Sequence, residues 1–366
     1  MTATQDLRAA GVSIWLDDLS RGRIRSGDLD RLIAESDVVG ITTNPTIFAA
    51  AFADGASYRE QAESLRAAGE SRVETALALM TDDVRAACDT FRPVFEETGG
   101  WDGRVSIEVS PVVADDPDAT LAECRRLRDL VDRPNLFVKI PATAAGVTAI
   151  EDAIAEGISV NVTLIFGLER YRQVIAAYVA GLERARAAGL DLARIHSVAS
   201  FFVSRVDVEV DRRLEASGDP RASGLRGRAA VANARLAYEV FEQSLREDRW
   251  RAVADSGANL QRPLWASTGV KDARLRDTLY VEELVAPHTV STMPEKTLDA
   301  VRDHALIRPD AITANEADAH AVMAALAEAG VSMDAVSETL ETAGIATFGA
   351  SWERLLAAVW PEDPPR

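Results

Sequence analysis

The clearest indication of the fold is a short apolar stretch near the middle of the chain, Leu136-Phe137-Val138-Lys139-Ile140-Pro141. Its length and its β-branched and aromatic residues are typical of a buried strand. Alternate side chains of a strand point to opposite faces, so Leu136, Val138 and Ile140 share one face, and Phe137 and Lys139 share the other. The stretch therefore predicts a buried strand with a lysine on one of its two faces.

A lysine in the middle of such a strand is unusual, because lysine is almost never fully buried without a partner or a task. The chain holds only three lysines against 37 arginines. A guanidinium does not deprotonate in a protein, whereas an amine in a dry pocket can lose its proton and attack a carbonyl group. Lys139 is therefore our candidate nucleophile. The alternatives are a chance survivor of an arginine-rich composition and an edge-strand lysine that reaches solvent.

Similar strand-type runs, each followed by a helix-type stretch, occur along the whole chain. We count eight, near Ser13, Gly40, Val105, Leu136, Ser159, His196, Pro263 and His288. Eight such units predict an α/β fold, a (β/α)8 TIM barrel, and no linker divides the chain, so we expect residues 1–366 to form one domain. Longer connections predict helical insertions over about 55–100 and 206–255. Residues 316–360 predict C-terminal helices that pack across the barrel.

Several of these runs also have a polar face. In a barrel, side chains at the carboxyl ends of the strands build the reactive site, and buried polar groups are costly unless they meet each other or a ligand. We therefore expect the following residues to converge: Asp17, Asn44, Glu108, Lys139, Asn161 and Thr163. A lysine nucleophile with two carboxylates and several amide and hydroxyl groups suits Schiff-base chemistry on a polyhydroxylated carbonyl compound.

The two carboxylates would divide the proton transfers between them. One would act on a substrate hydroxyl group during carbon–carbon cleavage, and the other on the water of imine formation and hydrolysis. Because a close carboxylate opposes loss of the lysine proton, we expect Asp17 and Glu108 to be separated from Lys139 or bridged to it by water. For either carboxylate alone, the alternative is a structural salt bridge.

Composition narrows the choice of compartment and partner. The net charge of −18 repels nucleic acid and anionic membranes, so neither is an expected partner. We see no signal-peptide pattern and no apolar run of the roughly 18 residues that a membrane span requires. The two cysteines offer no disulfide framework and the four histidines no metal-ligand spacing. We therefore expect a cytoplasmic protein without a metal or cofactor. The sequence does not specify an oligomeric state, and a homodimer is one option.

Two longer motifs resemble those of the transaldolase family. The stretch from Gly40 to Phe48, GITTNPTIF, is similar to the family's asparagine signature. The stretch from Leu136 to Thr143, which is followed by Gly146, is similar to the family's lysine signature. The resemblance covers most of the chain. It implies a cofactor-free, Schiff-base transfer of a dihydroxyacetone unit between sugar phosphates in the pentose phosphate pathway. Sedoheptulose 7-phosphate and glyceraldehyde 3-phosphate would give erythrose 4-phosphate and fructose 6-phosphate.

The resemblance also implies a role for each matching residue. Lys139 would be the Schiff-base lysine and Asp17 the acid/base of aldol cleavage, while Glu108 would activate a water held together with Thr163. The substrate-binding residues would be Asn44 and Asn161 for the dihydroxyacetone hydroxyl groups, and Ser200 and Arg205 for hydroxyl and phosphate contacts.

One departure from the family concerns the second phosphate ligand. Ser267 ends the seventh strand as that ligand does, but better-known branches carry an arginine just after it, whereas this chain offers Lys271 four residues later. A lysine is an adequate point charge for a phosphate group, so we assign Lys271 to phosphate. The alternative is an ordinary surface lysine.

Two other functions stay open at this stage. A fructose-6-phosphate aldolase is the nearest, but that branch tends to carry glutamine in place of Glu108 and tyrosine in place of Phe202. A sugar-phosphate isomerase or a binding barrel without covalent catalysis is the second, because this fold hosts many functions. Neither the isomerase nor the binding barrel would form a substrate-dependent covalent adduct at Lys139.

Overall fold

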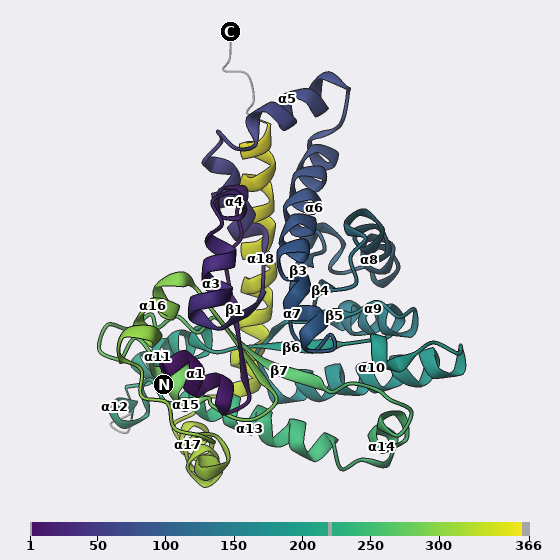
Figure 1. Ribbon diagram of the computed structural model, residues 1–366. Coiled ribbons are helices and arrows are strands. Elements are labelled where there is room, and N and C mark those ends of the chain that lie inside the picture. The colour runs from purple at the N-terminus through teal and green to yellow at the C-terminus, as the bar shows by residue number, and fades with distance from the viewer. Residues whose placement is uncertain (1, 219–221, 361–366) are drawn as a thin grey trace.

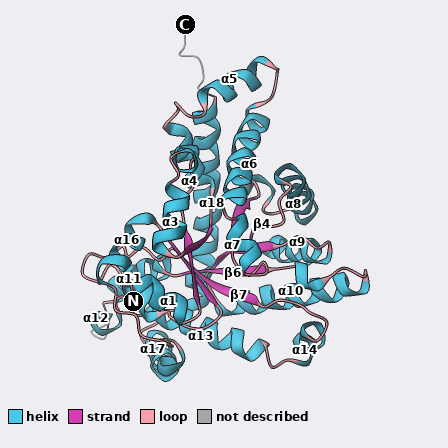
Figure 2. Ribbon diagram, viewed as in Figure 1, coloured by secondary structure: helices cyan, strands magenta, loops and turns pink. Residues whose placement is uncertain are grey.

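Eight parallel strands close into a barrel at the centre of the molecule, in the order β1 to β8 (Figures 1 and 2). The computed structural model describes residues 2–218 and 222–360. The strands are β1 (Val12–Leu16), β2 (Val38–Ile41), β3 (Arg104–Glu108), β4 (Leu136–Pro141), β5 (Val160–Ile165), β6 (Ser197–Phe202), β7 (Gln261–Ala266) and β8 (Thr289–Met293). Because β8 pairs with β1, the sheet has no free edge. The predicted (β/α)8 fold is confirmed.

Helices connect the strands and surround the barrel (Figure 2). As far as β5 they are α1 (Ala3–Ala9), α2 (Arg21–Arg25), α3 (Asp28–Ser36), α4 (Pro45–Ala53), α5 (Arg59–Ala67), α6 (Arg72–Thr90), α7 (Arg92–Glu97), the 3₁₀ turn η1 (Pro111–Val113), α8 (Pro117–Val131) and α9 (Ala144–Ala155). After β5 they are α10 (Leu168–Ala187), η2 (Leu192–Arg194), α11 (Ser204–Ser217), α12 (Ala222–Leu225), α13 (Ala229–Ser244), α14 (Asp248–Ala254), α15 (Leu279–Glu283), α16 (Glu295–His304), η3 (Thr313–Asn315), α17 (Glu316–Glu328) and α18 (Met333–Val359).

The last helix, α18, links the barrel to a group of helices that projects from it. It packs along α4 and α6, and its earlier part contacts α11 and β5 (Figure 1). A hydrogen bond of 2.8 Å between Thr46 Oγ1 and Ser351 Oγ joins α4 to α18. The helix therefore ties the connection after β2 to the carboxyl end of β5. Within the described ranges, no helix is both long enough and apolar enough to cross a membrane.

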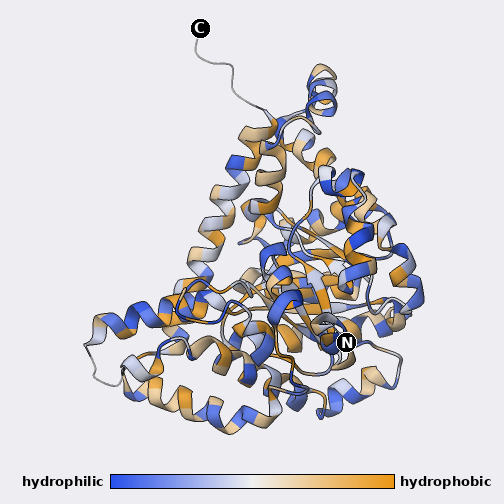
Figure 3. Ribbon diagram, turned by 60° about the vertical axis from the view of Figure 1, so that its left-hand side comes forward, coloured by the Kyte–Doolittle hydropathy of each residue, from blue (hydrophilic) through white to orange (hydrophobic). Residues whose placement is uncertain are grey.

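The inside of the barrel is filled by large side chains below the expected site. Figure 3 shows hydrophobic residues concentrated in the central strands, whereas the surrounding helices mix both kinds. The rings of Trp15 on β1 and Phe137 on β4 lie with centroids 6.0 Å apart. A side chain at Gly40 would lie 2.6 Å from the Trp15 indole, so this position needs glycine. Lys139 follows Phe137 by two residues and therefore lies one layer nearer the carboxyl ends of the strands.

Candidate active site

Lys139 lies inside the barrel on β4, and its residue is only 4% exposed. Its Nζ donates a hydrogen bond to the backbone carbonyl of Thr43 at 3.0 Å and lies 3.4 Å from Oε2 of Glu108. The expectation that both carboxylates stand apart from the ammonium is therefore wrong for Glu108. The reason is register: β3 and β4 are neighbours, and Glu108 pairs directly with Lys139 along the two strands.

Glu108 is a buried carboxyl group whose charge is only partly compensated. Neither of its oxygens has a hydrogen-bond partner among the described residues. Burial raises the pKa of Glu108 to about 7, even though the positive charge of Lys139 lowers it; the charge of Asp17 adds to the rise. Near neutral pH this group can therefore both accept and release a proton, as a general acid/base requires.

Asp17 follows β1 directly, and its Oδ1 accepts a hydrogen bond of 2.8 Å from the hydroxyl group of Thr42. Its backbone N–H donates to the carbonyl of Met293 at 2.8 Å, which fixes its place at the closure between β1 and β8. Burial raises the pKa of Asp17, whereas the charge of Lys139 and the Thr42 hydrogen bond lower it. Asp17, Glu108 and Lys139 thus act on one another electrostatically, as the strand pattern predicts.

Asn161 lies on β5 beside Lys139 in register and is fully buried. Its Nδ2 donates to the hydroxyl group of Ser106 at 3.0 Å, and its Oδ1 accepts from the hydroxyl group of Ser200 at 2.7 Å. These bonds link β3, β5 and β6 across the barrel. They leave one N–H of the Asn161 amide to donate to a ligand.

Thr163 and Asn44 each retain an unused polar group. Thr163 is fully buried on β5, and its Oγ1 has no hydrogen-bond partner in the described part of the chain. Asn44 begins α4: its Oδ1 accepts from the backbone N–H of Ile47 at 3.0 Å, which is the usual role of an N-cap asparagine. No hydrogen bond engages its Nδ2 within residues 2–218 and 222–360, so that group can donate to a substrate hydroxyl.

Arg205 and Ser267 lie at the start of α11 and at the end of β7. The Arg205 guanidinium carbon is 5.2 Å from the centroid of the Phe202 ring, and no described carboxylate forms an ion pair with it. Burial lowers the pKa of Arg205, whereas the charges of Asp17 and Glu108 raise it. The hydroxyl groups of Ser267 and Ser204 lie 3.0 Å apart. A half-buried cation and two hydroxyl groups near a helix N-terminus suit a phosphate group.

Lys271 is placed differently from the other predicted residues. It is exposed in the loop after β7, and no hydrogen bond or ion pair connects it to another described residue. The structure therefore couples Lys139, Asp17, Glu108 and Arg205 electrostatically, and it places Asn161, which is hydrogen-bonded to Ser200, beside Lys139 in register. It does not tie Lys271 to any of these residues.

Three supporting residues were not identified from the sequence: Thr42, Ser106 and Ser204. Thr42 holds Asp17, Ser106 holds Asn161, and Ser204 meets Ser267. Thr42 lies inside the asparagine motif and Ser204 directly precedes Arg205, so adjacency to a predicted site residue was the available signal for both.

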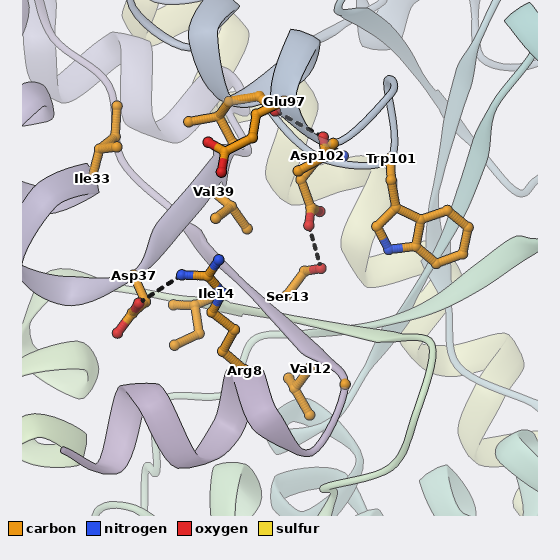
Figure 4. Close-up of a pocket in the computed structure, with 13 residues that line it drawn as sticks. Arg8, Val12, Ser13, Ile14, Ile33, Asp37, Val39, Glu97, Trp101 and Asp102 are labelled. Carbon is orange, nitrogen blue, oxygen red and sulfur yellow. Dashed lines mark hydrogen bonds and ion pairs between the residues drawn. The ribbon is translucent and has the colours of Figure 1, made fainter. Parts of the chain in front are cut away.

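A second polar cluster lies at the opposite, amino end of the strands, next to a cavity of about 310 Å³ (Figure 4). There the hydroxyl group of Ser13 donates to Asp102 at 3.0 Å, and Arg262 donates to Ser13 at 2.8 Å and to Asp102 at 3.1 Å. Figure 4 shows Ser13 and Asp102 facing each other beside Trp101. These groups satisfy one another, as is typical of the amino-terminal face of a barrel, which serves stability.

Comparison with known proteins identifies the family to which the chain belongs. A family model described as transaldolase/fructose-6-phosphate aldolase matches residues 14–359. The chain belongs to this family. A relative named transaldolase 1 from Streptomyces coelicolor is 60% identical over 357 residues, which cover 98% of this chain and 94% of the relative. A relative named transaldolase from Kocuria rhizophila is 60% identical over 358 residues, which cover 98% of this chain and 97% of the relative. Another named transaldolase, from Mycobacterium bovis, is 55% identical over 354 residues, which cover 96% of this chain and 94% of the relative. The family resemblance found in the two motifs is confirmed.

Proposed function

We propose that this protein is a transaldolase, which transfers a dihydroxyacetone unit from sedoheptulose 7-phosphate to glyceraldehyde 3-phosphate and yields erythrose 4-phosphate and fructose 6-phosphate. The observation that carries the proposal is the buried amine of Lys139, 3.4 Å from a carboxyl group whose pKa is raised to about 7. An amine in such surroundings can add to a ketone, and the neighbouring carboxyl group can move the protons that addition requires.

In the first half of the proposed reaction, Nζ of the unprotonated Lys139 attacks the ketone carbon of the donor. The resulting carbinolamine loses water and becomes an imine, and Glu108 protonates the departing hydroxyl group. Asp17 then accepts the proton of the hydroxyl group on the carbon beyond the bond that breaks. That carbon becomes an aldehyde and leaves as the shorter aldose, while the bonding electrons stay with the lysine-bound unit as an enamine.

In the second half, the enamine carbon attacks the aldehyde of the acceptor, and Asp17 returns its proton to the new hydroxyl group. Glu108 takes a proton from a water molecule that Thr163 helps to hold, and the water adds to the imine carbon. Cleavage of the carbon–nitrogen bond releases the new ketose and regenerates the lysine amine. Every proton is passed between these side chains, the substrates and water, so the scheme requires no cofactor.

Substrate binding is proposed from the groups that the protein leaves unpaired. Nδ2 of Asn44 and the remaining N–H of Asn161 would donate to the hydroxyl groups of the dihydroxyacetone unit. Arg205 would bind the phosphate group together with Ser267, and Ser200, which donates to Asn161, would contact a substrate hydroxyl group. Lys271 remains a proposed phosphate ligand, reaching in from its exposed loop.

Mass spectrometry after borohydride reduction tests the function directly. With fructose 6-phosphate present, reduction should fix a three-carbon or six-carbon adduct on the peptide that contains Lys139. A sugar-phosphate isomerase or a binding barrel would leave that peptide unmodified. An assay with and without an acceptor aldehyde tests the second family activity: release of free dihydroxyacetone without an acceptor would indicate a fructose-6-phosphate aldolase.

Two broader expectations also stand as proposals. We propose that residues 1–366 form one domain, because α18 and the helices after β2 and β6 pack on the barrel or on one another. We propose a cytoplasmic location, where sugar phosphates are available. A homodimer is one option that the sequence leaves open, and light scattering after size-exclusion chromatography distinguishes it from a monomer.

A further inference from the structure

Strand β5 contains an irregularity at the residue next to Thr163. Val162 pairs with Ala199 on β6, and Ile165 pairs with Phe201, so β5 uses three steps where β6 uses two. The extra residue forms a bulge, a feature that re-aims side chains near active sites. Leu164 lies in this bulge with φ +59°, a left-handed conformation that a leucine rarely adopts.

A buried hydroxyl group, that of Thr163, lies directly beside this bulge. Thr163 directly precedes Leu164, it is fully buried, and its Oγ1 lacks a hydrogen-bond partner among the described residues. A buried hydroxyl group without a partner is costly unless it serves a ligand or a water. A strained backbone of this kind persists only where the surrounding structure holds it in place.

The contact that holds Leu164 comes from a distant part of the chain. A Cβ added at Gly344 on α18 would lie 3.1 Å from Cδ2 and 3.3 Å from Cδ1 of Leu164, so the leucine side chain packs against the helix backbone. Two contacts anchor α18 there. Arg170 lies 3.4 Å from Glu341, and Arg213 donates to the carbonyl of Ala335 at 2.9 Å. The helix therefore has little freedom to withdraw from the leucine.

We propose that Gly344 is a positioning residue for the reaction. Because Gly344 has no side chain, α18 can approach Leu164 closely, and this contact keeps Leu164 in its left-handed conformation. The resulting bulge orients the Thr163 hydroxyl group toward the water used in imine formation and hydrolysis. This inference rests on the proposed function, which supplies the role of that water.

The test compares two identical substitutions on one helix. Gly344→Ala places a methyl group against Leu164, whereas Gly349→Ala, five residues along α18, meets nothing within 4 Å. Both changes replace glycine by the best helix former, so neither should lower the melting temperature through propensity. Because a misplacement of about 1 Å can cost about 10²-fold in rate, a shift of a few tenths of an ångström predicts about a tenfold lower kcat for Gly344→Ala. Its KM for fructose 6-phosphate and all constants of Gly349→Ala should stay within about twofold.

A double-mutant cycle shows whether Gly344 acts through Thr163. In a Thr163→Val background, which keeps the shape and removes the hydroxyl group, Gly344→Ala should have no further effect on kcat. An equal loss in both backgrounds, an unchanged kcat in Gly344→Ala, or a change confined to KM would overturn the inference. The proposed function would fail separately, since the unsubstituted protein would then form no borohydride-reducible adduct on Lys139.

Discussion

At the scale of single residues, the site depends on one amine that no other basic side chain can replace. Lys139→Arg keeps a buried positive charge near Glu108 but removes the nucleophile. We expect the variant to fold and to lose turnover by roughly a thousandfold or more. Steady-state kinetics and a thermal melt measure the two effects. Lys296→Arg, at an exposed position of α16, is the matched control and should behave like the unsubstituted protein.

Glu108 should set the pH dependence of both activity and stability. Its pKa is about 7 in the ligand-free protein, so kcat/KM should change with a midpoint near pH 7, and Glu108→Gln should be slow and lack that transition. The folded pKa lies above the unfolded value of about 4.3, so the folded state holds the proton longer and stability falls as pH rises between the two values. Relative to Glu108→Gln, the unsubstituted protein should therefore lose about 3 kcal/mol of unfolding free energy from about pH 4 to about pH 8. Urea titrations across this range would contradict the assignment if the difference were constant.

The two proposed phosphate cations can be separated by substrate choice. Arg205 is half-buried and forms no ion pair with a described carboxylate, so Arg205→Ala should raise KM for phosphorylated donors by about tenfold or more, the value of a lost charged hydrogen bond. An equal effect on an unphosphorylated ketose would show that the residue serves another purpose. Lys271→Ala measures how much the exposed lysine contributes to phosphate binding. The control is Arg212→Ala, because Arg212 is an exposed cation on α11, the helix that also carries Arg205.

The sequence predicted which side chains lie inside the barrel better than it predicted their contacts. Strand periodicity is local, so alternation alone placed Lys139 and Glu108 on the inner face. The register between β3 and β4 is not local, and it is what brings the two side chains to 3.4 Å. For the same reason neither the positive φ of Leu164 nor its contact with Gly344 could be predicted from local sequence, since both depend on a helix about 180 residues away.

At the scale of elements, the start of α4 combines a structural and a chemical task in one side chain. Asn44 accepts the Ile47 N–H as N-cap and leaves its amide nitrogen free among the described residues. Asn44→Asp keeps the acceptor and loses the donor, so it should retain stability while kcat/KM falls by about tenfold or more. Asn44→Ala loses both and should in addition cost about 1 kcal/mol of unfolding free energy. Equal stability losses in the two variants would show that capping is not the structural role.

At the scale of the whole molecule, the proposed active site and a buried polar cluster lie at opposite ends of the barrel. In the cluster at the amino ends of the strands, buried Arg262 forms an ion pair with Asp102 and donates a hydrogen bond to Ser13. Asp102→Ala leaves a buried cation without its partner, which typically costs about 3 to 5 kcal/mol. Calorimetry should show that loss, while kcat well below the melting temperature stays within about twofold. A large drop in kcat at low temperature would mean that the two ends are coupled.

Closure of the barrel also determines the stage of synthesis at which the proposed active site can form. Asp17 is anchored by the carbonyl of Met293, and Thr42, which holds its carboxylate, shares a hydrogen bond with Thr292. When Lys139, Asp17 and Glu108 have been translated, the β8 residues that position Asp17 and Thr42 have not yet been made. Because β1 pairs with β8, the proposed catalytic centre is complete in the nascent polypeptide only after β8 has been synthesised.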